Sequence, residues 1–261
     1  MNKLIGKSDG KTGISTLDKT SVTIRGKNLC KDLIGSINIT AYFYFLLVGK
    51  EPNEEQIFFL DAVLVAIAEH GLTPSVQASR MTYAAGPEAL QGAVAAGILG
   101  CGSVILGSSQ DAGEFLSKGV NEAAELGGAI KDVAMKMVEQ YKADGRRLPG
   151  LGHPDHWPVD PRTERLIDLA KSRGIAGKHT EFLIETGIAA DRLYNRHFVI
   201  NISAAIPAIM LDLDFPLVAI KGIPILARTI GLIAHAYEES QRPIGFLMSS
   251  HGDTKIDYDG G

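Results

Sequence analysis

The feature that most restricts the fold is a long series of helix-like segments, preceded by a single strand-like region. In residues 53–68, Asn53 is a good N-cap, Glu54 and Glu55 occupy the first turn, and apolar side chains then cover nearly every face. Residues 10–27 are instead rich in Thr, Gly and β-branched residues and have no helical period. The sequence therefore predicts an all-α protein with a short N-terminal β-hairpin or arm.

The segment from Glu114 to Lys142 is more polar than the segments around it. It has the pattern of two amphipathic helices separated at the Gly127-Gly128 pair, which indicates a more exposed subdomain. No linker is long enough to separate independent domains. The sequence therefore predicts a large helical domain and a smaller helical insert: residues 1–107 with 216–261, and residues 108–215.

Composition bounds the possible partners. A net charge of −4 gives no electrostatic reason to expect nucleic acid. The N-terminus lacks the apolar core of a signal peptide, and the long apolar stretch 198–220 is broken by Asn, Asp and Pro residues. The two cysteines lack metal-ligand spacing. We therefore expect a cytoplasmic protein with no membrane, nucleic-acid or metal partner.

Four basic residues stand in settings that favour a ligand site. His70 ends an apolar helix beside a loop, although a histidine there also suits the helix dipole, and His153 lies in a rigid Pro/Gly loop. Arg162 lies in a first helical turn, where its charge opposes the dipole. Arg228 is alone among aliphatic residues, so it needs an anion, either an internal carboxylate or a bound one.

Arg228 shares its helix with further polar residues. His235 lies seven residues later on the same face, and we expect a packed polar residue behind the site rather than a catalyst. Glu238 and Glu239, at the end of the helix, are expected to be solvated. Arg242 follows near the C-terminus.

In their order and setting, these residues resemble the motifs of the citrate synthase family. The family's "GxGH…DPR" and "SRxxGxxAH" signatures and its late "RP" all have counterparts here. The matching segments are Ile14–Asp18, Ile24–Gly26, Asp32-Leu33, Leu46–Pro52, His70-Gly71, Pro149–His153, Asp160–Arg162, Ala227–His235 and Arg242-Pro243.

The resemblance implies a citrate synthase-like fold and a homodimer or higher homo-oligomer. It also implies a catalytic set of His153, His70 and the replaced position Ser203, with His153 accepting the carbinol proton of the substrate. Carboxylate binding would fall to His70 together with Arg162, Arg228 and Arg242, the last reaching into the neighbouring subunit's site. Coenzyme A would lie over the loop Pro149, Gly150, Leu151 and Gly152, as a thioester substrate rather than a tightly bound cofactor.

This sequence also departs from the family pattern. Full-length citrate synthases have roughly a hundred more residues before the first histidine, and the short form resembles citryl-CoA lyase and the lyase module of ATP-citrate lyase. Leu106 replaces the histidine that bonds the acetyl-CoA enol oxygen, Ser203 replaces the aspartate that moves a proton at the acetyl methyl, and Pro154 replaces the arginine of "GHR". By this resemblance, the retained residues would bind oxaloacetate, and the lost histidine and aspartate would have acted on the acetyl group.

These comparisons lead to three hypotheses. The first is a citryl-CoA lyase that forms oxaloacetate and acetyl-CoA. The second is cleavage or condensation of another 3-hydroxyacyl-CoA, a citrate synthase-type acyltransfer, with Asp111, Asp155 or His156 replacing the missing aspartate. The third is a non-catalytic carboxylate- or CoA-binding homologue, because a neutral Ser203 is no acid or base near pH 7.

Overall fold

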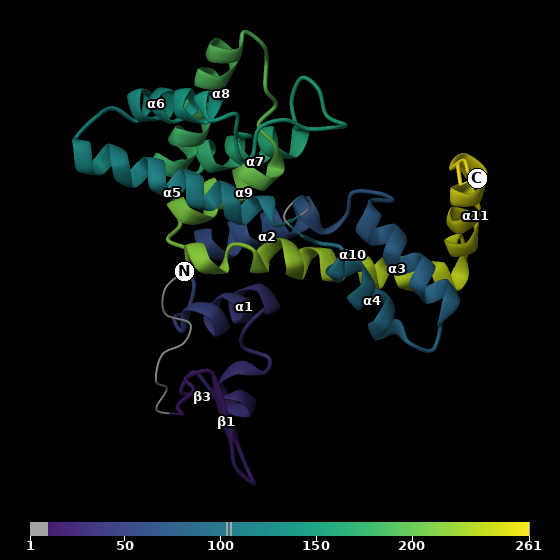
Figure 1. Ribbon diagram of the computed structural model, residues 1–261. Helices are drawn as coiled ribbons and strands as arrows, with labels where there is room; N and C mark the ends of the chain where they lie inside the picture. Colours follow the sequence, from purple (N-terminus) through teal and green to yellow (C-terminus); the bar gives the residue numbers. More distant parts are fainter. Residues whose placement is uncertain (1–9, 103, 105, 261) are drawn as a thin grey trace. The chain divides into compact units, whose positions relative to one another are not determined.

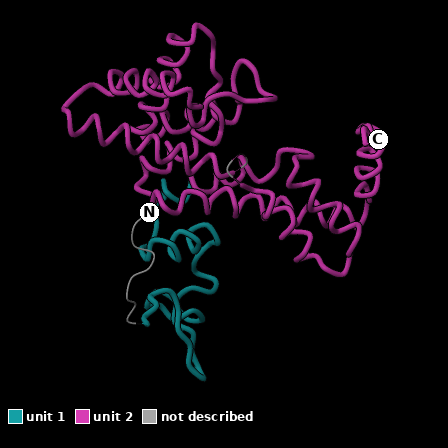
Figure 2. The backbone as a smooth tube through the Cα atoms, viewed as in Figure 1, with its two compact units in different colours: residues 1–58 teal, residues 59–261 magenta. Residues whose placement is uncertain are grey.

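The computed structural model describes residues 10–102, 104 and 106–260. The chain divides into two compact units, residues 1–58 and residues 59–261 (Figure 2). Helix α2 (Glu54–Ala68) begins in the first unit and continues in the second. Asn53 caps it as predicted, because its side chain accepts a hydrogen bond from the Gln56 amide and the Gln56 side chain bonds back to the Asn53 amide.

The first unit confirms the predicted hairpin and adds a short third strand. Its elements are β1 (Ser15–Leu17), β2 (Val22–Ile24), β3 (Lys27–Asn28), the π-helical turn η1 (Leu29–Leu33) and α1 (Ile39–Val48). The strands pair antiparallel in chain order, with Ser15 opposite Ile24 and Thr23 opposite Asn28. A small core of Ile24, Leu33 and Phe45 joins the sheet, η1 and α1.

The second unit is helical throughout its regular elements (Figure 1). Helices α3 (Pro74–Ala85), α4 (Leu90–Leu99), α10 (Gly222–Gln241) and α11 (Gly245–Lys255) form one group, in which α3 contacts the other three and α10 also contacts α4. The stretch of residues 217–241 is long and apolar enough to cross a membrane. Because α10 packs on α3 and α4 and buries Arg228 and Glu239, it has the surroundings of a core helix.

The remaining helices pack around a second apolar core. They are α5 (Ser108–Leu126), α6 (Ile130–Ala143), α7 (Pro161–Ser172), α8 (Lys178–Tyr194) and α9 (Ile202–Asp212), followed by the 3-10 turn η2 (Leu217–Ala219). Helix α9 is almost entirely buried and contacts α5, α7 and α8. Phe182 lies so close to α5 that a Cβ at Gly119 would overlap its ring. The buried N-terminus of α9 brings Ser203 and its neighbours to the cavity described below.

The helical architecture confirms the predicted fold class. The predicted break at the Gly127-Gly128 pair is also present, because α5 ends at Leu126 with Gly127 in the left-handed region. The two-domain division at residues 107 and 216 stays a prediction. Helix α5 does begin at Ser108, but the compact units separate at residue 58.

Candidate active site

The second unit contains a cavity of about 1050 Å³, at the upper end of the range for small-molecule sites. It is lined by the C-terminal end of α2, the start of α3, the residues around the start of α5, the loop before α7, the segment between α8 and α9, and α10. All the catalytic and binding residues predicted from the sequence line this cavity except Arg242, and of the three candidates to replace the missing aspartate, Asp111 and Asp155 line it but His156 does not. The structure therefore brings together four predicted basic residues, His70, His153, Arg162 and Arg228.

The loop Pro149–Gly152 forms one wall and is held rigidly against the start of α9. Gly150 and Gly152 have φ of +77° and +95°, and a Cβ at Gly150 would overlap the Ala204 side chain. The Gly152 amide donates to the Val199 carbonyl at 2.7 Å, and the Asn201 side chain donates to the Gly152 carbonyl at 2.8 Å. The wall is thus largely preformed backbone.

His153 follows this loop and is positioned by its own backbone. Its Nδ1 accepts hydrogen bonds from the amides of Asp155 and His156, both at 3.0 Å. Because an amide nitrogen only donates, the neutral ring carries its proton on Nε2. Nε2 lies 3.2 Å from Nη2 of Arg162, so two hydrogen-bond donors face each other. Such a pair is suited to an acceptor placed between the two donors.

Arg162 is fixed by Asp160, which is 1% exposed. The Asp160 carboxylate accepts from the Arg162 amide, from Nε at 2.9 Å and from Nη2 at 2.9 Å, and also from the Ile202 amide at 3.0 Å. It therefore caps α7 and joins α7 to α9. Burial raises the pKa of Asp160, but the Arg162 hydrogen bonds and charge outweigh that effect and hold this pKa below its ordinary value.

Both imidazoles are neutral near pH 7. Burial lowers the pKa of His70, and the Arg162 charge lowers it further. Burial also lowers the pKa of His153, with the neighbouring His156 as the next cause. The nearby carboxylates of Asp155 and Asp160 oppose these shifts without reversing them. These rings can therefore give or take a hydrogen bond near neutral pH.

His70 lies just after the end of α2, where Gly71 turns the chain with a φ of +71°. The Glu69 carboxylate accepts from the His70 and Gly71 amides at 2.8 and 2.6 Å. Among the described residues, the His70 ring makes no hydrogen bond, and its centroid lies 6.0 Å from that of His153 and 5.3 Å from that of His156. Its place in the cavity is therefore set by its backbone.

Arg228 on α10 is 3% exposed, and hydrogen bonds with the described residues do little to offset the burial of its charge. Its one hydrogen bond is a long one, 3.4 Å from Nη1 to the Thr73 hydroxyl, and its buried Nε has no partner within the described chain. Burial lowers the pKa of Arg228, which the charge of Glu69 partly offsets without forming an ion pair. Of the two anions considered from the sequence, the described residues supply no internal one, so the guanidinium is suited to a bound anion.

The acetyl-handling positions are different in character. Leu106, which replaces a family histidine, is buried in the left-handed region with a φ of +66°. Ser203 lines the cavity in the first turn of α9, where its amide donates to the N-cap Asn201. Two carboxylates line the cavity without being bound to Arg162, namely Asp111 on α5 and Asp155. Both were candidates to replace the missing aspartate, and both are exposed.

The structure bears differently on the expectations for Arg242, Glu239 and Glu238. Arg242 is exposed and does not line its own chain's cavity, so the predicted reach into a neighbouring subunit stays a prediction. Glu239 was expected to be solvated, and this is wrong, because it is 2% exposed and bonds Arg80 at 2.7 Å. Its neighbour Glu238 is about half exposed and also bonds Arg80. Arg80 itself, a buried cation in α3, was missed because nothing in its local sequence distinguishes it from a surface arginine.

Three imidazoles in the cavity region are close enough to hold a metal ion. The nearest ring nitrogens of His70, His153 and His156 all lie within 4.8 Å of one another. Nδ1 of His153 is already used by two amides, and Nε2 faces the Arg162 cation, which repels a divalent ion. The donor set therefore fits an anion better than a metal.

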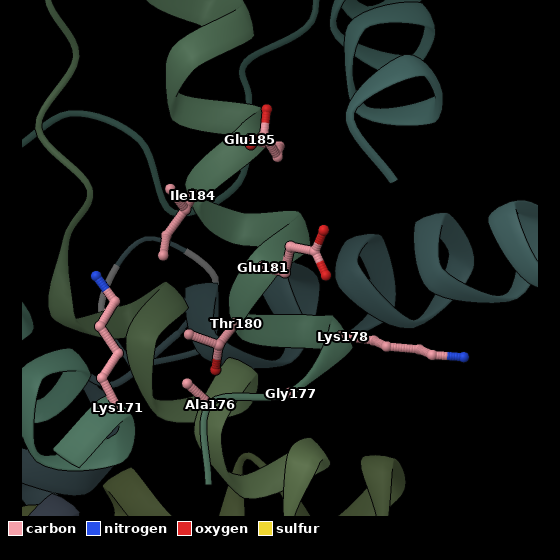
Figure 3. A pocket seen from close by; sticks show the side chains of 8 residues that line it. All are labelled: Lys171, Ala176, Gly177, Lys178, Thr180, Glu181, Ile184 and Glu185. Atoms are coloured by element: carbon pink, nitrogen blue, oxygen red, sulfur yellow. The ribbon is translucent and has the colours of Figure 1, made fainter. Parts of the chain in front are cut away.

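A second pocket, of about 420 Å³, lies between the end of α7 and the start of α8 (Figure 3). Its charged side chains are Lys171, Lys178, Glu181 and Glu185, which are of mixed sign. It has no histidine and no buried unpaired cation among its lining residues. The chemistry of the molecule is therefore concentrated in the larger cavity.

Comparison with known proteins agrees with the helical fold. A family model described as the C-terminal domain of citrate synthase matches residues 10–245. The solved citryl-CoA lyase of Hydrogenobacter thermophilus is 31% identical, with a TM-score of 0.86, and the match covers 97% of this chain and 96% of that one. The ATP citrate lyase of Methanothrix soehngenii, solved with citrate and coenzyme A, is 21% identical with a TM-score of 0.77 over 99% of this chain and 43% of that one.

Curated relatives are more distant. The ATP-citrate synthase beta chain protein 1 of Arabidopsis thaliana is 24% identical over 199 residues, which are 70% of this chain. The citrate synthase of Haloferax volcanii is 26% identical over 233 residues, which are 85% of this chain. The matched part spans 31% of the plant protein and 58% of the archaeal one.

Proposed function

Because the chain belongs to the citrate synthase family, we propose that it is a carbon–carbon lyase that cleaves citryl-CoA to oxaloacetate and acetyl-CoA. Family and fold support an enzyme of this superfamily, and the specific reaction is the proposal. The observation that carries it is the set of convergent donors in one cavity: Nε2–H of His153, the guanidinium of Arg162, and the buried, unpaired guanidinium of Arg228.

These donors suit the oxo-acid half of the substrate. Asp160 already balances the charge of Arg162, so Arg228 is the cation with the greater need of a carboxylate. Arg162 keeps guanidinium hydrogens that Asp160 does not use and can bind a second carboxylate through them. The oxygen on the carbinol carbon then belongs beside Nε2–H of His153.

Cleavage requires a proton to leave the hydroxyl group. As that proton leaves, the bond between the carbinol carbon and the methylene carbon breaks, and its electron pair moves onto acetyl-CoA as a thioester enolate. The hydrogen bonds of His153 favour its role as donor to the oxygen over the predicted role of proton acceptor. We assign the acceptor role to His70, whose neutral ring has an unshared nitrogen and makes no hydrogen bond among the described residues.

The enolate must then take up a proton to become the methyl group of acetyl-CoA. Ser203 has no acid strength for this step near pH 7, and Leu106 offers no hydrogen bond. The remaining carboxylates on the cavity wall are Asp111 and Asp155, and each can relay a solvent proton. Substitution of each by asparagine separates these two candidates.

The same cavity also offers groups that are suited to coenzyme A. The backbone loop Pro149–Gly152 offers a preformed wall, and Arg146, Arg147 and Arg196 also line the cavity, as cations suited to phosphate groups. The exposed Trp157 ring supplies a face on which a base can stack. These residues are the proposed binding site for the coenzyme A part of the thioester.

The test is direct. Purified protein is incubated with citryl-CoA, and oxaloacetate is measured by reduction to malate, with a family lyase run in parallel. Release of oxaloacetate supports the proposal. Its absence, while the control lyase turns over, contradicts it, and a panel of other 3-hydroxyacyl-CoA thioesters then tests a different acyl group.

A second candidate function has one observation in its favour, the serine at position 203. It is a non-catalytic subunit that binds a carboxylate or coenzyme A. It predicts saturable binding of oxaloacetate or coenzyme A in calorimetry with no turnover of any thioester. Oxaloacetate release by the wild-type protein excludes it.

A further inference from the structure

A chain of hydrogen bonds connects the buried Arg80 to the backbone of His70. Nη1 of Arg80 lies 3.3 Å from Nδ1 of His235, and Nε2 of His235 lies 2.8 Å from the Glu69 carboxylate. The other oxygen of Glu69 accepts from the His70 and Gly71 amides at 2.8 and 2.6 Å. Four groups therefore lie in series between α3 and the cavity.

The direction of every bond in this chain is determined. A guanidinium only donates, so Nδ1 of His235 accepts and the neutral ring carries its proton on Nε2. Nε2–H therefore donates to Glu69, which accepts again from the two amides. The pKa of Glu69, which burial alone raises, is instead lowered by the hydrogen bond from His235, by the charge of that ring when it is protonated, and by the two amides. No donor in the chain faces another donor, in contrast to His153 and Arg162.

The far end of the chain is anchored deeply. Arg80 is 3% exposed, and its Nε bonds the buried Glu239 at 2.7 Å while its Nη2 bonds the carbonyl of Arg242 at 3.0 Å. Glu239 in turn accepts from the amides of Ile244 and Gly245 at the start of α11. His235 is thus held by a cation that cannot move without disturbing α3, α10 and α11.

Helix α10 also contacts the end of α2 by close backbone approach. A Cβ at Gly231 would overlap the carbonyl oxygen of Ala68, the last residue of α2, so only glycine permits this approach. His235 lies one turn further along α10, within reach of Glu69. The close approach and the hydrogen bond together fix the exit of the chain from α2.

We propose that His235 is a positioning residue for His70. Its hydrogen bonds link the fixed Arg80 through Glu69 to the His70 backbone, and this link sets where the His70 ring stands in the cavity. The inference rests on the proposed function in that it takes the His70 ring as part of the active site. His70 needs such support because, among the described residues, its ring makes no hydrogen bond of its own.

The test breaks the chain at Glu69, which is about half exposed and outside the buried cluster. In Glu69→Gln, the amide oxygen can still accept from the His70 and Gly71 amides, but the amide nitrogen then meets Nε2–H of His235, donor against donor. His235→Gln keeps an acceptor for Arg80 and a donor for Glu69, so it is the conservative rescue. Glu238→Gln is the matched control, because Glu238 has the same 47% side-chain exposure and bonds Arg80 but does not touch the His70 loop.

Two readouts are taken for each variant. The first is the pKa of the His70 ring, followed by NMR of its Cε1–H in the ligand-free protein. The second is kcat and KM with citryl-CoA. Glu69→Gln is expected to move the His70 pKa up toward its ordinary value and to lower kcat/KM about tenfold, mostly through kcat, since displacing a reacting group by an ångström has effects of this order or greater. The other two variants are expected to stay within about twofold of wild type.

The proposal is overturned if Glu69→Gln leaves both readouts unchanged, or if Glu238→Gln or His235→Gln matches it. A wild-type protein that does not turn over citryl-CoA contradicts the proposed function instead. The NMR comparison still decides the positioning role in that case, because it needs no substrate.

Discussion

Two groups of residues line the same cavity, and they differ in how fully they are held. The donor group, His70, His153, Arg162 and Arg228, consists of basic side chains positioned by buried or backbone contacts. The acyl group, Leu106, Asp111 and Ser203, offers a hydrocarbon, an exposed carboxylate and a hydroxyl that has no activating partner among the described residues. Under the proposed function, the difference predicts that recognition of an oxo acid and proton transfer at a thioester carbon are separable in this fold.

The largest effect is expected when one cation of the donor group is removed. Arg228→Met keeps the apolar stem and removes the charge. Oxaloacetate binding, measured by calorimetry, is expected to weaken about 100-fold or more, because a charge-assisted, bidentate pair in a buried site is worth about 3 kcal/mol. The free energy of unfolding should stay level or rise, since the variant buries no uncompensated guanidinium.

Arg192→Met is the control for this variant. Arg192 is exposed on α8 and does not line the cavity, so both its affinity and its stability should match wild type. A stable Arg228→Met protein that binds oxaloacetate as tightly as wild type would remove Arg228 from the site.

The second test asks whether the donor group depends on its internal carboxylate. Asp160→Asn leaves Arg162 without its counter-ion and is expected to lower the free energy of unfolding by about 3 kcal/mol in urea, as does breaking a buried ion pair elsewhere. Because the pKa of Asp160 is below its ordinary value, its stabilisation is present at neutral pH and lost as pH falls through that lowered pKa. The loss in the variant should therefore shrink in acid.

Asp168→Asn, an exposed change on the same helix, is the matched control. In the acyl group, Asp111→Asn should also leave stability within about 0.5 kcal/mol, as surface changes usually do. Equal losses in Asp160→Asn and Asp111→Asn would contradict the contrast between the two groups.

The sequence alone was sufficient for the helices and for most of the donor group, for physical reasons that can be stated. Caps and glycine breaks are local, so Asn53 and Gly127 marked real helix ends. An arginine among aliphatics signals a special environment wherever it folds, which made Arg228 visible.

Pairings across the chain were not visible in the same way. Arg80 bonds Glu239 across 159 residues, and no local pattern links them. For the same reason Glu239 was mistaken for a solvated residue. The tautomer of His153 likewise depends on two amides whose direction is a property of the folded loop, and it changes which role that ring is suited to.

The next test adds to the acyl group of residues the carboxylate that it lacks at position 203. Ser203→Asp introduces a carboxylate into the first turn of α9, where the helix dipole also favours a negative charge. Deuterium exchange at the methyl of acetyl-CoA, followed by NMR, is expected to rise about tenfold, less than the roughly 100-fold or more of a well-positioned general base, because the surrounding residues are not arranged for this carboxylate. Ser108→Asp, at another position on the cavity wall, is the control, and an equal rise there would mean that charge alone, and not its place, is responsible.

The smallest effect concerns pH and separates the two histidines of the donor group. A bound dianion favours an imidazolium, so binding should raise the lowered pKa of His70 and take up protons. Affinity for oxaloacetate is therefore expected to tighten by about threefold as pH falls from about 7.5 to about 6.5, less than the tenfold limit for one full proton.

Calorimetry in buffers of different ionisation enthalpy measures the proton uptake. The proton uptake should vanish in His70→Gln. It should persist in His153→Gln, because Nδ1 of His153 already accepts hydrogen bonds from two amides and resists a second proton. It should also persist in the exposed control His251→Gln. Uptake that survives in His70→Gln would assign the titration to another group and with it the proton acceptor of the proposed reaction.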